Sequence, residues 1–169
     1  MNTRQGFTLV ELMVTLAILV ILLATTAPSL TELYQAYRAN AAISKLQQGL
    51  KLARNQAISY GARVTLCPLE NNVCGNDWNK NLTIFTDGGN LNELDGNDKI
   101  LMRLDDADKN DIIEFNRPSV RYLPDGLASA SNGTLKYCPD YATSPYSKAL
   151  VINNAGKVRL SKTTVSCSH

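Results

Sequence analysis

Positively charged side chains gather in the last 37 residues of the chain. Between Gly133 and His169 there are five basic residues and one acid, Asp140, a net charge of +4 in a chain whose total is +2. The rest of the chain is therefore slightly acidic, and this asymmetry suggests an anionic partner. The basic residues are Lys136, Lys148, Lys157, Arg159 and Lys162.

Two of these cations have a spacing that suits phosphate groups. In the run Gly156-Lys157-Val158-Arg159, a strand conformation places Lys157 and Arg159 on the same face, about 7 Å apart. This distance is close to the separation of adjacent phosphates along one strand of DNA. The alternative is a solvated strand face whose charges bind no ligand.

The four cysteines indicate disulfides in an exported chain. They are Cys67, Cys74, Cys138 and Cys167, and three pairings are open. The pairing of sequence neighbours, Cys67 with Cys74 and Cys138 with Cys167, is favoured because it closes one short loop and ties down the C-terminal tail. A zinc site is the rival, but no pair has C-x-x-C spacing and the one histidine is His169.

Catalytic chemistry finds little support in the sequence. A Ser/His/Asp or Cys/His site needs a histidine held by the fold, and His169 ends the sequence. The paired acids Asp105-Asp106, and Asp108 with Asp111, fall in a polar linker and are expected in solvated turns. The sequence therefore predicts no enzyme activity and no cofactor.

An acidic loop over residues 87–98 is rich in Asp, Asn and Gly, so calcium has to be considered. The loop lacks the glycine at the sixth place and the alternating ligands of an EF-hand. A solvated hairpin connection is the favoured interpretation.

One carboxylate, Glu11, interrupts the longest apolar segment. It is the single ionisable side chain from Phe7 to Ala27. As a helix these residues would extend about 31 Å, enough to cross a bilayer core. A carboxylate there needs a partner, and a cut after Gly6 would give a neighbouring copy a free amine on Phe7. The alternative is a plain signal anchor oriented by Arg4.

The elements that must position these residues are a long helix followed by strands. A second, amphipathic helical stretch over residues 29–60 has apolar residues at spacings of mostly three and four, and Gly61 should end it. The apolar stripe is Leu33, Tyr37, Ile43, Leu46, Leu50, Ala53, Ala57 and Tyr60. The period then changes to two, and short strands are expected at 63–67, 82–86, 99–104, 112–115, 120–123, 135–138, 149–152 and 157–160. This order predicts an α+β fold.

The N-terminal residues Gly6-Phe7-Thr8-Leu9-Val10-Glu11 resemble the class III signal of type IV pilins and type II secretion pseudopilins. The resemblance implies that prepilin peptidase cuts after Gly6 and N-methylates Phe7, that Glu11 is the assembly carboxylate, and that Pro28 matches the family's helix-breaking proline. It also implies a pilin-like fold: a leader at 1–6, a transmembrane or filament-core helix at 7–28, the amphipathic helix at 29–60, and an antiparallel β domain at 61–169.

The C-terminal half resembles the GspH/FimT family of minor pilins. The resemblance is carried by the acidic loop after Phe85, by Pro124-Asp125-Gly126, by Cys138, and by the run from Asn153 to Arg159. FimT-like members that act in natural transformation bind DNA through a Gly-Arg-x-Arg motif. In this chain Lys157 replaces the first arginine, and a lysine neutralises phosphate without the bidentate fork of arginine.

The resemblance implies a FimT-like minor type IV pilin that binds extracellular double-stranded DNA for uptake. Lys157 and Arg159 would contact phosphates, helped by Lys162, Lys148 and Lys136. The other implied partners are major and minor pilins, prepilin peptidase and, before assembly, the bacterial inner membrane, with the C-terminal domain in the periplasm and later on a cell-surface pilus. The alternative is a FimU-like priming or structural minor pilin, or a GspH-like pseudopilin of type II secretion, without DNA binding.

Overall fold

The structure is a computed structural model that describes residues 8–168, apart from the side chains of residues 25–29. The predicted leader 1–6 and the predicted processing residues Gly6 and Phe7 lie outside the described residues. The chain divides into two compact units between Tyr37 and Arg38. One helix, α1 (Leu9–Tyr60), contributes to both units.

In the first unit, α1 presents an exposed apolar surface. Its large hydrophobic side chains from Leu9 to Leu23 are all more than half exposed. The helix begins with a reciprocal cap, in which the Glu11 N–H donates to the Thr8 hydroxyl at 3.3 Å and the Thr8 N–H donates to the Glu11 carboxylate at 3.5 Å. Among the described residues, no helix combines the length and the hydropathy needed to span a membrane.

In the second unit, α1 buries one apolar stripe. The buried residues are Ala39, Ile43, Leu46, Leu50, Ala53 and Ala57. Their spacing of three and four confirms the predicted period from Ile43 to Ala57. Leu33 and Tyr37, which belong to the first unit, and Tyr60 are 66%, 72% and 59% exposed.

The end of α1 is set by Gly61, as predicted. Gly61 has φ of +60°, its N–H donates to the Ile58 carbonyl, and the Ala62 N–H donates to the Ala57 carbonyl at 3.3 Å. This is the two-bond Schellman arrangement that a left-handed residue allows.

In the described part of the chain, nine antiparallel strands follow the helix. They form a five-stranded sheet in the order β2-β1-β3-β4, in which β6 also pairs with β1, and a four-stranded sheet in the order β5-β7-β8-β9. All the predicted strands are present, and one that was expected to be loop, β2, pairs with the end of β1. The strands are β1 (Val64–Glu70), β2 (Val73–Cys74), β3 (Leu82–Thr86), β4 (Ile100–Arg103), β5 (Ile112–Glu114), β6 (Val120–Tyr122), β7 (Gly133–Cys138), β8 (Lys148–Ile152) and β9 (Val158–Leu160).

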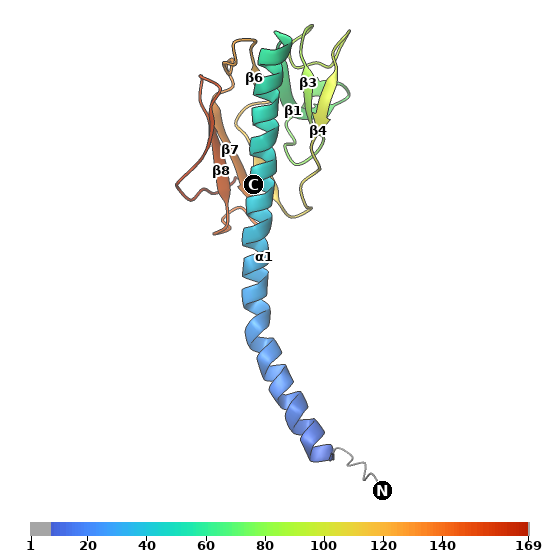
Figure 1. Cartoon of the computed structure of the whole chain (residues 1–169), viewed down its shortest axis with the longest axis vertical. Helices are drawn as coiled ribbons and strands as arrows, with labels where there is room; N and C mark the ends of the chain where they lie inside the picture. The colour runs from blue at the N-terminus through green and yellow to red at the C-terminus, as the bar shows by residue number, and fades with distance from the viewer. Residues whose placement is uncertain (1–7, 169) are drawn as a thin grey trace. The chain divides into compact units, whose positions relative to one another are not determined.

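Within the second unit, the two sheets share the helix as their common packing partner. Figure 1 shows β1, β3 and β4 on one side of α1 and β7 and β8 on the other. The core contains Leu50 of the helix, Leu66 and Ile84 of the first sheet, and Leu135 and Leu150 of the second sheet. All five side chains are fully buried. Burying one such side chain contributes roughly 1.5–3 kcal/mol.

Two disulfides hold the ends of the sheets, and they are the pairs that sequence adjacency favoured. Cys67 bonds to Cys74, with Cα atoms 5.5 Å apart, and Cys138 bonds to Cys167, with Cα atoms 6.3 Å apart. The first joins β1 to β2. The second fixes the segment after β9 to the end of β7, and the Cys167 N–H donates to the Ala142 carbonyl at 2.9 Å.

A charged cluster lies inside the second unit, where the sequence predicted only a polar turn. The Arg38 guanidinium lies 2.9 Å from Asp111, 2.6 Å from Asp140 and 3.4 Å from Asp108. The Asp111 side chain is 2% exposed and also accepts a hydrogen bond from the Tyr137 hydroxyl. Burial and this bond to Asp111 raise the pKa of Tyr137. The expectation of a solvated turn is therefore wrong for Asp111, because α1 brings a cation to it.

We expect Asp111→Asn to lower the free energy of unfolding by about 3 kcal/mol, because it removes the buried partner of an arginine that is itself largely buried. Asp108→Asn should cost less than about 1 kcal/mol, since that carboxylate is mostly in solvent. Urea denaturation of the full chain in mild detergent, followed by the fluorescence of the buried Trp78, measures both. Equal losses of unfolding free energy in the two variants would show that the buried Arg38–Asp111 pair stabilises the protein no more than the exposed Arg38–Asp108 pair.

Candidate functional site

The hairpin of β8 and β9 carries the predicted phosphate-binding residues. Its turn is closed at Asn153: the Gly156 N–H donates to the Asn153 carbonyl at 2.9 Å, and the Lys157 N–H donates to the Asn153 side-chain oxygen at 2.9 Å. The Asn153 N–H in return donates to the Lys157 carbonyl at 3.2 Å. Three bonds to one asparagine therefore fix the backbone at Lys157.

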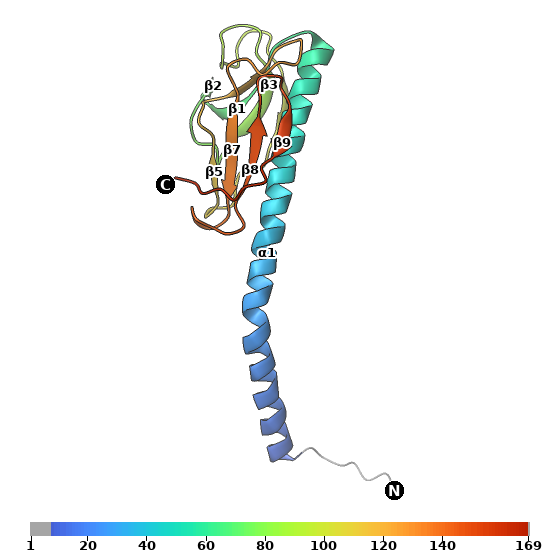
Figure 2. The same cartoon turned by 90° about the vertical axis from the view of Figure 1, so that its left-hand side faces the viewer.

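Strand alternation places the two cations of this hairpin outward. Val158 pairs with the buried Ile152 and packs against the hydrophobic core. Lys157 and Arg159, on either side of Val158, are exposed. Figure 2 shows β8 and β9 beside the part of α1 that belongs to the second unit.

The strand register shows which other predicted cations share this outer face. Arg159 lies opposite Val151, and Lys136 lies opposite Ala149, two residues earlier on β8. Residues two apart point to the same side of a sheet, so Lys136 lies on the face of Arg159. Lys148 lies opposite Tyr137, on the other face. The sheet therefore brings Lys136, Lys157 and Arg159 to one face and separates Lys148 from them.

The predicted cations also differ in how they are neutralised. Lys136 pairs with Glu114 of β5 at 3.3 Å, a partner that sequence alone did not indicate. Among the described residues, no carboxylate lies within ion-pair distance of Lys157, Arg159 or Lys162. Those three are exposed and keep their charge available to a ligand.

Glu114 also holds the segment that follows β9. Its carboxylate accepts hydrogen bonds from the Ser168 hydroxyl and, at 3.1 Å, from the Ser168 N–H. The Ser168 hydroxyl and N–H, with the Lys136 ammonium, hold the pKa of the Glu114 carboxyl below its usual range against the opposing effect of desolvation. This contact and the Cys138–Cys167 disulfide fasten the segment that carries Lys162.

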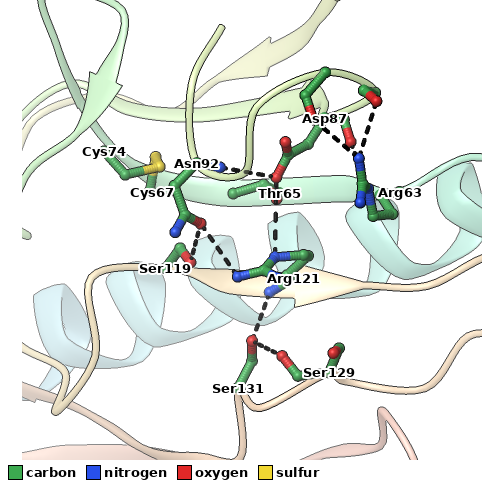
Figure 3. Close-up of polar contacts among 12 residues, drawn as sticks. Arg63, Thr65, Cys67, Cys74, Asp87, Asn92, Ser119, Arg121, Ser129 and Ser131 are labelled. Carbon is green, nitrogen blue, oxygen red and sulfur yellow. Dashed lines mark hydrogen bonds and ion pairs between the residues drawn. A yellow bond between two sulfur atoms is a disulfide. The ribbon is translucent and has the colours of Figure 1, made fainter.

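The acidic loop 87–98 is not a solvated connection throughout, because its first residue is buried. The Asp87 carboxylate is fully buried and accepts a hydrogen bond from the Thr65 hydroxyl at 2.6 Å (Figure 3). The Arg121 guanidinium of β6 lies 3.9 Å away. Arg63 donates to the carbonyls of Asp87 and Gly88 at 2.8 and 2.9 Å.

Asn92 attaches the middle of this loop to the same cluster. Its N–H donates to Asp87 at 3.2 Å, and its side-chain oxygen accepts from the Ser119 hydroxyl at 2.6 Å and from Arg121 at 3.5 Å (Figure 3). The cluster joins β1, β3 and β6 to the loop, so Asp87 has a structural function. The sequence did not indicate this function, because Asp87 is one of several acidic residues in the loop.

Asp95 and Asp98 accept hydrogen bonds from the loop's own backbone, and the Glu93 carboxylate accepts one from the Asn90 side-chain amide at 3.1 Å. Asp98 accepts from the Gly88 N–H at 2.8 Å, and Asp95 accepts from the Asn90 N–H at 3.1 Å. Within the described part of the chain, no group of three or more His, Cys, Asp or Glu residues is arranged to hold a metal ion.

Comparison with protein families identifies the chain. The family model for the type II transport protein GspH matches residues 42–156. The chain belongs to the GspH family. The model for the prokaryotic N-terminal methylation motif matches residues 1–27, which supports the pilin and pseudopilin membership predicted from Gly6 to Glu11. Members of this class assemble with other pilins after processing by prepilin peptidase.

Solved structures show the same fold. The type IV minor pilin FimU of Pseudomonas aeruginosa, in one crystal form, has a TM-score of 0.61 and 20% identity over 77% of this chain and 95% of FimU. A second crystal form of FimU has a TM-score of 0.59 and 21% identity, and the match covers 76% of this chain and 99% of that FimU chain. The predicted α+β, pilin-like fold is therefore confirmed. No curated relative matches the chain.

The family match ends at Gly156 and leaves the cations of the hairpin outside it. The family match therefore includes the turn but gives no information on Lys157 and Arg159, for which the geometry of the hairpin is the evidence.

The lowered pKa of Glu114 predicts how stability depends on pH. A carboxyl with a depressed pKa in the folded state stabilises the protein above its unfolded pKa of about 4.3, and this contribution is lost as the pH falls through the folded value. We expect Glu114→Gln to unfold more easily than the parent at pH 6, and the difference to shrink towards pH 3.

Unfolding midpoints across this pH range test the prediction. Glu32→Gln, which changes an exposed glutamate of α1, should show the pH dependence of the parent. A Glu114→Gln difference that stays constant down to pH 3 would assign the stabilisation to something other than the ionised carboxylate.

Proposed function

We propose that this chain is a low-copy minor subunit of a type IV pilus that binds extracellular double-stranded DNA without sequence preference, for uptake in natural transformation. The observation that supports DNA as the ligand is the pair Lys157 and Arg159, both exposed, on one face of a fixed hairpin, with no ion-pair partner among the described residues. Lys162 extends this charge, and Lys136 and Lys148 contribute less.

The chemistry of the pair suits the DNA backbone and does not suit base recognition. An ammonium and a guanidinium about 7 Å apart on a strand can each contact a phosphate. Contacts of this kind orient the duplex, carry no base information and weaken steeply with salt. Two or three cations bind weakly in one subunit, so several subunits or other pilins would have to add avidity.

Assembly into the filament is the other part of the proposal. Prepilin peptidase would cut after Gly6 and methylate the amine of Phe7, and Glu11 would neutralise that amine in a neighbouring subunit. The subunit would lie in the bacterial inner membrane through residues 7–28, with its C-terminal domain in the periplasm, before it enters a pilus at the cell surface.

A structural or priming minor pilin, or a type II secretion pseudopilin, is the second candidate. It is favoured by the end of the family match at Gly156, before both cations, and by the likeness to FimU. In that case the hairpin would be a charged surface or a contact to another pilin.

DNA binding is tested by replacing both cations of the hairpin. We expect the full chain in mild detergent to bind a short labelled duplex. Because each phosphate that a cation neutralises adds about one unit to the slope of log affinity against log salt, Lys157→Gln/Arg159→Gln should reduce that slope by about 2. Fluorescence anisotropy at several salt concentrations measures the slope.

The matched control removes the same charge from the other sheet. Lys99→Gln/Arg103→Gln also replaces one exposed lysine and one exposed arginine, at β4, and should change the slope little. Equal reductions in the two double variants would indicate a general charge effect. A parent that does not bind even at low salt would exclude DNA as the ligand and leave the structural minor pilin.

Assembly is tested at Glu11. We expect Glu11→Ala subunits to be processed normally but to be depleted from purified filaments, because the amine of the neighbouring Phe7 would stay uncompensated in an apolar setting. Immunoblots of sheared filaments and of membranes compare the two pools. Normal incorporation of Glu11→Ala would refute the assembly function of this carboxylate.

A further inference from the structure

The turn of the β8–β9 hairpin is attached to α1 through one side chain, Arg54. Its Nε–H donates to the Gly126 carbonyl at 2.9 Å, and its Nη2 donates to the Ala155 carbonyl at 3.2 Å. Gly126 follows β6 and Ala155 lies in the hairpin turn, so one guanidinium joins the helix to two separate chain segments.

The two segments that Arg54 joins also touch each other directly. A Cβ at Gly156, where φ is +72°, would lie 2.0 Å from the Gly126 carbonyl oxygen and 2.8 Å from Arg54 Nε. The Ala128 N–H donates to the Asn154 carbonyl at 3.0 Å. Only glycine fits at position 156, both for its backbone conformation and for this close approach.

The hairpin needs such an attachment because β9 has few others. β9 has three residues and is the last strand of its sheet, bonded to β8 alone among the described strands. Lys157 precedes β9, and among the described residues its backbone bonds to Asn153 of the turn. A contact at Ala155 and Gly156 is therefore well placed to decide how firmly Lys157 and Arg159 are oriented.

We propose that Arg54 is a positioning residue of the candidate DNA site: it fixes the turn Asn153–Lys157 to the helix and thereby presents Lys157 and Arg159 to the phosphates at a constant spacing. This inference rests on the proposed DNA-binding function. Pre-ordered cations lose less conformational entropy on binding than mobile ones, so the attachment favours affinity although Arg54 spends its own donors on carbonyls.

The form of the guanidinium explains why this position takes arginine. Its Nε and Nη2 are donors on one edge of a single planar group, and together they reach two carbonyls. A lysine keeps the charge but places its three donors on one nitrogen. Arg54→Lys therefore separates a positioning function from a direct contact with phosphate.

The experiment compares Arg54→Gln, Arg54→Lys and the control Lys51→Gln in the full chain in mild detergent. Lys51 lies one turn earlier on α1 and is exposed, and within the described part of the chain its side chain makes no hydrogen bond to the hairpin. The first readout is amide hydrogen exchange over residues 153–160. The second is binding of the labelled duplex.

We expect both Arg54 variants to exchange at least about tenfold faster over residues 153–160, equivalent to about 1.4 kcal/mol of local opening, with β7 unchanged. We also expect both to bind the duplex several-fold more weakly than Lys51→Gln. Arg54→Lys that binds as tightly as the parent would overturn the inference, since charge alone would then suffice.

The two readouts keep this inference and the DNA proposal apart. Unchanged exchange over residues 153–160 in Arg54→Gln overturns the positioning function whether or not DNA binds. If exchange is faster only in the hairpin but the parent does not bind DNA, the attachment by Arg54 is supported and DNA is excluded as the ligand. Faster exchange in β7 as well would mean general destabilisation and would count against a local function of Arg54. The variant Gly156→Ala, which disturbs the same junction without removing a charge, checks that result.

Discussion

The apolar stripe of α1 from Ala39 to Ala57 is the contact on which the second unit depends. Each sheet presents apolar side chains to this stripe, so the helix is the element that relates the two sheets. Because side chains three and four apart lie on neighbouring parts of a helix surface, burial of the stripe also fixes where the flanking residues point. Arg38 and Arg54 flank it, and each carries a cation to a partner on a sheet or beside it.

Much of the fold follows from two periods in the sequence. Spacings of three and four predicted the buried face of α1 between Ile43 and Ala57, and alternation predicted the strands. Both signals are local, and so is the stop at Gly61. The division into two sheets was not predictable, because strand order depends on contacts between segments far apart in the chain. β2 was missed because two residues are too few to show alternation.

The candidate site could be predicted in part for the same reason. Strand alternation was enough to place Lys157 and Arg159 together. It did not show that Glu114 neutralises Lys136, that Lys148 faces the other way, or that Asp111 and Asp87 are buried, since each of these depends on a partner from another element. One missed feature was local: Thr8 and Glu11 have the spacing of a capping box, so the carboxylate proposed for assembly already has a partner within its own chain.

Within the four residues from Gly156 to Arg159, the backbone path is set by one residue and the surface charge by two others. The glycine is confined by its backbone angle and by the Gly126 carbonyl, so a change there alters the path of the chain. Lys157 and Arg159 are exposed, and exchanges at such surface positions usually shift stability by less than about 0.5 kcal/mol. Chains with this hairpin could therefore gain or lose an affinity for polyanions by single substitutions while the filament subunit stays the same. Evolution within such a fold would be expected to keep the turn and vary its charges.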